Sequence, residues 1–268
     1  QCARHNKSQT VGTYKMMGIN WRWLLAGLFL YFCLLVAYLP ASQVVSRISL
    51  PDNVKVGNVQ GTLWQGEVDR VIVNNIPVNQ LSWDVSPWAL FTGQLAVELD
   101  AGNMRDAASI AFNGPVSVSL FDFQAVSAED FLLYLPVDRV LSEVQLPLPV
   151  NAGGRFRVNI ENLTYSAQGC DQMMAYGDWL NARVAGTQGP IELGTFSAQI
   201  RCQDEQIVIN VEEPNAFGLS MQASARQDFS GLSVKGQFKP DPSLPQEVHE
   251  AALFFGRPDA NGYTQFEL

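Results

Sequence analysis

The sequence contains few of the residues that enzymes use for nucleophilic or acid–base catalysis. It has two histidines among 268 residues, and only His249 lies outside the first 22 residues. A Ser-His-Asp or Cys-His arrangement would have to use this one imidazole. Because His249 falls in a helix predicted near the C-terminus, a solvated side chain is the simpler interpretation. We therefore expect no catalytic residue and no enzymatic activity.

Residues that bind metals or cofactors are equally scarce. The four cysteines show no CxxC spacing, so one imidazole and scattered carboxylates would have to supply the ligands. Several acidic residues are adjacent in sequence, which points their side chains to opposite faces of a strand. These pairs are Glu129-Asp130, Asp204-Glu205 and Glu212-Glu213. No GxGxxG or Walker sequence occurs. We expect no metal site and no cofactor.

Positive charge is also in short supply. The chain has 17 Lys and Arg residues against 26 Asp and Glu residues. All the acidic residues and 13 of the basic residues follow residue 22, so that part of the chain carries a net charge of −13. Nucleic-acid phosphates require a basic face. We therefore expect no nucleic-acid partner.

The first feature that is present is a long apolar run. Residues 23–39, WLLAGLFLYFCLLVAYL, carry no charge, and as a helix they would reach about 26 Å, near the thickness of a bilayer's hydrocarbon core. Pro40 then ends the helix. The sequence predicts a transmembrane helix over 23–39, with lipid-facing side chains at Trp23, Leu24, Leu28, Phe29, Phe32, Leu35 and Leu39.

Charge sets the orientation of this helix. Four basic residues and no acidic residue precede it, at Arg4, Lys7, Lys15 and Arg22. The positive-inside rule then makes residues 1–22 a cytoplasmic leader and carries the bulk of the chain across the membrane. A cleavable signal peptide is the alternative, but the apolar run is longer than the usual h-region. Met16 or Met17 would suit as a start residue, which would make residues 1–15 artefactual.

Two cysteines lie beyond the predicted membrane helix. Cys170 and Cys202 would occupy an oxidising compartment once the chain is exported, which favours a disulfide over two buried free thiols. The bridge would be structural, because it closes a loop of about 33 residues and lacks the spacing of a redox site.

From residue 50 onward, short runs alternate apolar and polar residues between Gly, Pro and Asn, the pattern of antiparallel strands. The predicted strands are 54–59, 63–73, 78–85, 94–100, 107–112, 116–123, 154–160, 163–168, 179–185, 192–202, 206–212, 218–227 and 231–238. Short helices are predicted at 127–135, ended by Pro136, and at 245–255. Residues 146–150, LPLPV, are an extended crossing. The fold class is mainly β, a single N-terminal transmembrane helix followed by a curved antiparallel sheet.

The predicted sheet reads as two similar halves, 40–148 and 149–268. A strand with Trp83 precedes LFTGQLAVEL at 90–99, and a strand with Trp179 precedes IELGTFSAQI at 191–200. Each half ends in a predicted short helix. Duplication would give a long curved sheet, and chance resemblance between two meanders is the alternative.

Large aromatic side chains are frequent beyond residue 40. We predict an apolar face that includes Trp64, Trp83, Trp88 and Trp179, with further rings at Phe91, Phe112, Phe121, Phe123, Phe156 and Phe196. Their ordinary role is the core beneath a sheet. The alternative is an incompletely covered face that forms an apolar trough for an acyl chain.

Several segments resemble the bacterial type II secretion system protein N family. They are VQGTLWQG at 59–66, LSW at 81–83, LFTGQL at 90–95 and LPLPVNAGGRF at 146–156, with Gly194 and Cys202. The GTLWxG piece is shared with other β-rich envelope proteins, including the AsmA-like group implicated in lipid movement. The resemblance implies a bitopic inner-membrane protein with a periplasmic domain and no active site, an accessory part of the machinery that exports folded proteins across the outer membrane.

We therefore expect a non-enzymatic periplasmic scaffold in the cell inner membrane that docks other type II secretion components. Edge strands or the apolar face would receive them. A carrier of lipid or another apolar ligand is the alternative.

Overall fold

The computed structural model describes residues 21–47, 51, 53–73, 76–143, 151–203, 206–226 and 231–267. It divides into two compact units, Gln1–Leu39 and Pro40–Leu268. Each unit is considered by itself below. The predicted leader 1–22 lies outside the described residues except for its last two positions, as does the predicted crossing at 146–150.

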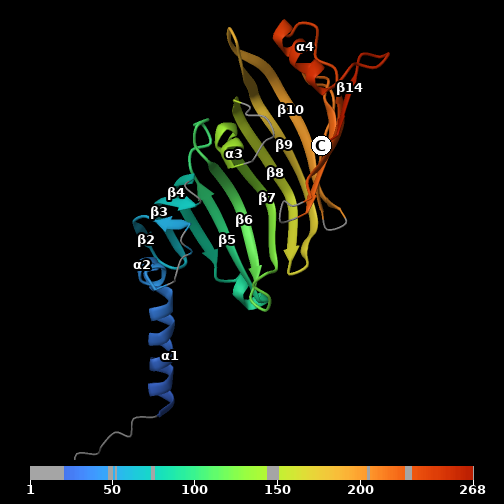
Figure 1. The fold of residues 1–268 in the computed structure, drawn as a ribbon. Helices are drawn as coiled ribbons and strands as arrows, with labels where there is room; N and C mark the ends of the chain where they lie inside the picture. The colour runs from blue at the N-terminus through green and yellow to red at the C-terminus, as the bar shows by residue number, and fades with distance from the viewer. Residues whose placement is uncertain are drawn as a thin grey trace, which may run out of the picture. The chain divides into compact units, whose positions relative to one another are not determined.

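The first unit contains one helix, α1 (Trp21–Ala37), drawn in blue in Figure 1. Its helical hydrogen bonding continues to Tyr38, whose N–H donates to the carbonyl of Leu34 at 3.0 Å. Arg22 is its one charged residue, and none of its side chains is buried. Among the described residues, no helix has both the length and the apolar character needed to cross a membrane. The predicted span at 23–39 therefore stays a prediction.

The second unit is built on a single antiparallel sheet. Its strands are β1 (Val54–Val56), β2 (Val59–Gly61), β3 (Gln65–Val73), β4 (Ile76–Ser86), β5 (Gln94–Ala101), β6 (Ala111–Ser119), β7 (Val126–Pro136), β8 (Ala152–Ser166), β9 (Gly169–Gly186), β10 (Gly189–Gln203), β11 (Gln206–Val211), β12 (Ser220–Arg226), β13 (Ser233–Phe238) and β14 (Thr264–Glu267). The predicted mainly β, antiparallel fold is confirmed.

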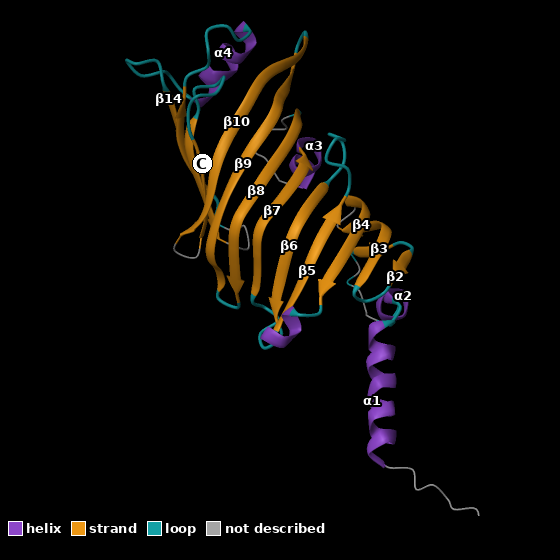
Figure 2. Cartoon of the chain, turned by 180° about the vertical axis from the view of Figure 1, so that it is seen from behind, coloured by secondary structure: helices purple, strands orange, loops and turns teal. Residues whose placement is uncertain are grey.

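The strands follow one another in the sheet in the order of the sequence. From β3 to β14, each strand pairs with the next one along the chain, and β1 and β2 both pair with β3 at the first edge. The sheet is not closed, because among the described strands β14 pairs only with β13. Figure 2 shows that the sheet is twisted and curved rather than flat.

The helices of this unit are short, and all but α2, which precedes β1, lie between strands. They are α2 (Ala41–Val45), the 3-10 turn η1 (Ala89–Thr92), α3 (Val137–Glu143), α4 (Gln246–Ala252) and the 3-10 turn η2 (Leu253–Phe255). The helix predicted at 245–255 is confirmed by α4 and η2. At this end of the sheet, Val248 of α4 packs into a buried cluster with Ala182, Ile191, Leu193 and Phe196.

The pairing register gives the sheet two chemically different faces. One face, here called the apolar face, carries Val68, Trp83, Val97, Leu99, Phe112, Val116, Leu133, Phe156, Val158, Trp179, Phe196, Ile200, Ile209, Val211, Ala223 and Phe238. The opposite face, the polar face, carries Glu67, Ser82, Asp84, Glu98, Asn113, Ser117, Arg157, Asp178, Ser197, Gln199, Gln222 and Lys235. This alternation is typical of an antiparallel sheet with one face turned away from water.

The helix predicted at 127–135 is wrong, because these residues form β7. Leu133 pairs with Phe112 on β6 and with Val158 on β8. The hydroxyls of Ser127 and Ser117 lie 2.7 Å apart across the same ladder. Pairing on both sides outweighs the local helix signals of the segment. The helix begins only after Pro136, as α3.

Other boundaries also differ from the prediction. The predicted strands 107–112 and 116–123 are not separate, because Asn113, Gly114 and Pro115 lie inside β6, where a bulge accommodates them. The runs at 154–160 and 163–168 form one continuous strand, β8. Strand β9 begins at Gly169 rather than 179, and β14 was not predicted. The predicted boundary at 148/149 lies outside the described residues. Strands β7 and β8 pair across it, and the division into repeated halves stays a prediction.

Candidate functional site

The apolar face has one tryptophan on β4 and another on β9, and glycines on the neighbouring strands make room for both. Trp83 on β4 lies opposite Gly66 on β3, where any Cβ would collide with the indole ring. The Trp83 Nε1–H donates to the carbonyl of Leu63 at 3.1 Å. Gly61, at φ +88°, and Thr62, whose N–H donates to the Gln65 carbonyl at 2.8 Å, close the β2–β3 turn beneath it. The segment at 61–66 is thus a tight hairpin that holds Trp83.

Trp179 on β9 is held in a similar way by β8. Its Nε1–H donates to the carbonyl of Gly153 at 2.9 Å. Gly154 has φ +107°, and a Cβ there would lie 2.8 Å from that same nitrogen and 2.6 Å from the Leu180 carbonyl oxygen. The ring stacks between Phe156 and Phe196, with centroid separations of 6.0 and 5.5 Å. A side chain at 154 would displace this aromatic stack.

Arg155, the next residue, fastens a loop to the sheet. It is buried, and its guanidinium donates to the carbonyls of Met104 and Ser109 in the loop between β5 and β6. The guanidinium carbon also lies 4.2 Å from the centroid of the Tyr134 ring. Burial lowers the pKa of Arg155 below its usual value, against the opposing effect of Tyr134 and Asp106. These contacts hold the loop between β5 and β6 against β8, and the buried Nε of Arg155 has no hydrogen-bond partner among the described residues.

The four predicted tryptophans do not form one cluster. Trp83 and Trp179 share the apolar face but are separated by β5 to β8. Trp64 lies in the β2–β3 turn, where its carbonyl accepts from Val85 N–H at 2.6 Å. Trp88 precedes η1 and is 77% exposed. The register places Trp83 and Trp179 on the apolar face, and a functional site that uses all four tryptophans stays a prediction.

The sequence model of the family described as type II secretion system (T2SS), protein N matches residues 52–267. This chain belongs to the type II secretion system protein N family. The type II secretion system protein N of Vibrio cholerae is 27% identical over 236 residues, which cover 86% of this chain and 90% of that protein. The Aeromonas hydrophila protein of the same name is 27% identical over 247 residues, covering 89% and 94%.

A relative of lower sequence identity matches over a similar length. The type II secretion system protein N of Klebsiella pneumoniae is 24% identical over 247 residues, which cover 89% of this chain and 90% of that protein. No solved structure matches this chain. The matched residues 52–267 span the whole sheet, so family membership concerns the sheet itself and not a small motif.

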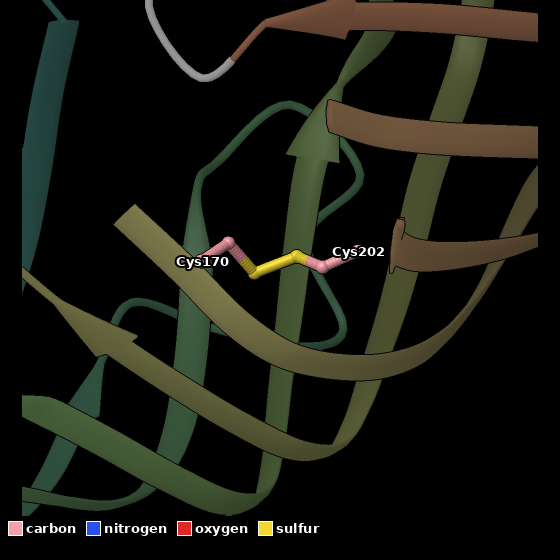
Figure 3. Close-up of a disulfide and its surroundings, with 2 residues drawn as sticks. All are labelled: Cys170 and Cys202. Carbon is pink, nitrogen blue, oxygen red and sulfur yellow. A yellow bond between two sulfur atoms is a disulfide. The ribbon is translucent and has the colours of Figure 1, made fainter. Parts of the chain in front are cut away.

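In this protein N family member, a disulfide joins two neighbouring strands. Cys170 at the start of β9 is bonded to Cys202 near the end of β10, with the Cα atoms 6.1 Å apart (Figure 3). This is the pair that the sequence predicts. Both residues are partly buried, and the bond closes one end of the β9–β10 hairpin.

The described residues hold no group of three His, Cys, Asp or Glu side chains that could bind a metal ion. His249 lies in the last turn of α4. Glu129 and Asp130 lie at an irregular point of β7, where Asp130 has φ +50°, and Asp204 and Glu205 lie outside the described residues. The absence of an active site remains an expectation.

Sequence reasoning missed a polar network at the centre of the sheet. Asp178 on β9 accepts from Arg157 Nη2 on β8 at 2.6 Å and from Ser197 Oγ on β10 at 2.7 Å. Burial raises the pKa of Asp178, but the hydrogen bonds from Ser197 and Arg157 outweigh burial and leave it below its usual value. Only the cross-strand register brings these three residues together, so no local pattern could reveal them.

Proposed function

We propose that this protein is a non-enzymatic component of the type II secretion system that offers its sheet as a docking platform for other components of that system. The observation that carries the proposal is the open antiparallel sheet itself, which spans the region matched by the protein N family. An open sheet has edges whose outer backbone groups can accept another strand. The relatives named above are all secretion components.

The edge at β14 is the better candidate for such docking. At the other edge, β1 and β2 are two short pieces interrupted at Gly57 and Asn58, and α2 packs beside β2. Strand β14 is a single run in which Gln265 and Glu267 are exposed. Its neighbour β13 occupies one side only. A partner chain in extended conformation would therefore add a strand along Thr264–Glu267.

The anchor that we propose is α1, followed by Tyr38 and Leu39. Its side chains are almost all apolar and none is buried within the chain, a composition that water does not favour and a bilayer does. Its 17 residues stand at the short end of what spans a hydrocarbon core. This placement makes the protein a single-pass inner-membrane protein with a cytoplasmic N-terminus and the sheet in the periplasm.

A photoreactive benzoylphenylalanine placed at Gln265 in the full chain tests the docking edge. Gln199 is the matched control, because it is an exposed glutamine on β10 in the middle of the sheet. In cells that assemble the secretion system, we expect an adduct with another component at Gln265 and none at Gln199. Equal adducts at both positions, or none at Gln265, would contradict the edge as the docking site.

A carrier of lipid remains the alternative for the apolar face. The relatives are named for secretion and none for lipid, which favours the docking role. Native mass spectrometry of the full chain in detergent separates the two. A lipid retained at fixed stoichiometry would support the carrier, and a protein released free of lipid supports the platform.

A further inference from the structure

One end of the sheet, here called the turn end, gathers loops that lie far apart in sequence. The start of β3 pairs with the end of β4, at Gln65 and Asp84. The start of β5 pairs with the end of β6, at Gln94 and Ser119. The turn at 62–64 and the loops at 87–93 and 120–125 therefore all lie at the turn end.

Two of these loops expose large aromatic rings. Trp88 and Phe91 in the first loop are 77% and 84% exposed, and Phe121 and Phe123 in the second are 89% and 73% exposed. These four residues are here called the aromatic patch. Rings of this size are normally buried in a core, as the sequence analysis expected of them. Four of them on neighbouring loops form an exposed apolar surface that calls for a partner.

The two loops are held together by contacts between them. Leu120 N–H donates to the Gly93 carbonyl at 2.9 Å, and Phe121 lies so close to Gly93 that a Cβ there would collide with its ring. The Trp88 and Phe91 ring centroids are 6.0 Å apart. Gly93, at φ +76°, ends η1 in a left-handed conformation that favours glycine. The aromatic patch is thus held by turns that are fixed by hydrogen bonds and ring contacts.

Charge is nearly absent from the aromatic patch. Among residues 87–93 and 120–125, Asp122 is the one charged residue, and its Oδ1 accepts from the Gln124 N–H at 3.0 Å. A protein-docking surface would usually surround its aromatic anchors with a polar, hydrogen-bonding rim. Tryptophan and phenylalanine with a single charged residue, Asp122, among them instead suit the interface of a bilayer.

The chain enters the sheet unit at this same end. Pro40, the first residue of that unit, forms an isolated bridge with Thr62 in the β2–β3 turn. Helix α2 follows and packs beside β2. The segment that leaves α1 therefore joins the sheet at the turn end, beside the loops of the aromatic patch. If α1 lies in a bilayer, the turn end is the part of the sheet unit tethered closest to the lipid.

We propose that the aromatic patch inserts into the interfacial layer of a phospholipid bilayer and gives the sheet a second membrane contact besides α1. This inference rests on the proposed membrane anchor. Two contacts would fix which way the sheet points from the membrane, whereas a single span would leave it free to rotate about the chain at Pro40.

The test reconstitutes the full chain in phosphatidylethanolamine and phosphatidylglycerol liposomes that contain a phospholipid with a diazirine in its acyl chain. After irradiation, mass spectrometry locates the lipid adducts along the chain. Phe254 in η2 is the matched control, because it is 90% exposed and lies beside α4, at the end of the sheet opposite the turn end. We expect adducts on α1 and on 87–93 and 120–125, with none at Phe254.

Each outcome distinguishes the inference from the anchor on which it rests. If α1 is labelled and both loops stay unlabelled, the aromatic patch does not contact lipid and the inference is overturned. If α1 is also unlabelled, the anchor itself fails. In the triple variant Phe91→Ser, Phe121→Ser, Phe123→Ser, labelling of the two loops should fall at least five-fold while labelling of α1 is unchanged. If that variant labels as the wild type does, the rings are not the contact.

Discussion

At the scale of single residues, the apolar face depends on where glycine stands. Gly66 and Gly154 each face a tryptophan of a neighbouring strand, and neither leaves room for a Cβ. Gly154 also has φ +107°, a conformation that strains any other residue. These glycines explain two segments, at 61–66 and 153–155, that the sequence marks as distinctive without showing what they do.

Replacing Gly154 with Ala should lower the free energy of unfolding by about 1–3 kcal/mol, because a Cβ displaces Trp179 and the backbone is strained. Gly177→Ala is the control on β9, since its Cβ would meet Ile200 at an ordinary 3.6 Å. Urea unfolding of the full chain in detergent, followed by tryptophan fluorescence, measures both. Equal midpoints for the two variants would contradict the role given to Gly154.

The polar network of Asp178 predicts a dependence on pH. Burial acts against ionisation, but Ser197 and Arg157 hold the folded-state pKa below its usual value. The stabilisation is therefore present above the unfolded-state pKa of about 3.9 and is lost as the pH falls through the lower folded-state value.

Asp178→Asn should therefore lower stability at pH 7, by about 0.5–1 kcal/mol for a partly exposed pair, and this loss should shrink as the pH falls toward the folded-state pKa. Asp171→Asn serves as a control on the same strand. The measurement compares urea midpoints of both variants with wild type at pH 7 and pH 3. A loss that is equal at the two pH values would show that the carboxylate charge is not responsible.

At the scale of elements, local patterns predict some strands well and others not at all. Strands β3 to β5 and β10 to β13 alternate clearly, and their positions agree with the prediction. Segment 127–135 begins with Ser, Ala, Glu and Asp and continues with leucines, which resembles a capped helix, and only its two partner strands make it β7. The first half of β9 alternates weakly and is a strand because β8 and β10 flank it.

The candidate site was predictable to a similar degree. The cysteine pair could be assigned because the predicted export would leave just two cysteines, Cys170 and Cys202, in an oxidising environment. The exposure of the aromatic side chains could not be predicted, because rings inside strands and rings in loops look alike in sequence. Phe121 and Phe123 were placed in a strand but lie in the loop after β6.

Removing the disulfide should loosen the β9–β10 hairpin. With a sequence separation of 32 between the cysteines, the chain-entropy relation gives a loss of about 3–4 kcal/mol for Cys170→Ser. Cys33→Ser is the control, because Cys33 is a free, exposed thiol on α1. Thermal unfolding without reductant should show a lower Tm for Cys170→Ser and an unchanged Tm for Cys33→Ser. With dithiothreitol present, the wild type should approach the Cys170→Ser variant.

At the scale of the whole sheet unit, the separation of an apolar from a polar face extends over the full width of the sheet. No second sheet covers the apolar face among the described residues, and α4 reaches only the end near Trp179. Many side chains of the apolar face are thus half-buried, by side chains of the adjacent strands of the same curved sheet. A docking platform and a lipid trough would both use such a surface. The proposed experiments therefore test partner binding at the edge strand β14, lipid contact at the turn end and lipid retention on the apolar face one by one.

The order of the strands has a consequence for how the protein is made. From β3 to β14, every strand finds its partner in the strand just before it. If the chain is exported as proposed, the residues after α1 leave a translocation pore in the order of the sequence, so the sheet can form hairpin by hairpin without waiting for residues still inside the pore. Cys170 would then emerge as a free thiol that cannot form this disulfide until β10 delivers Cys202, so the bond closes only after ten of the 14 described strands have left the pore.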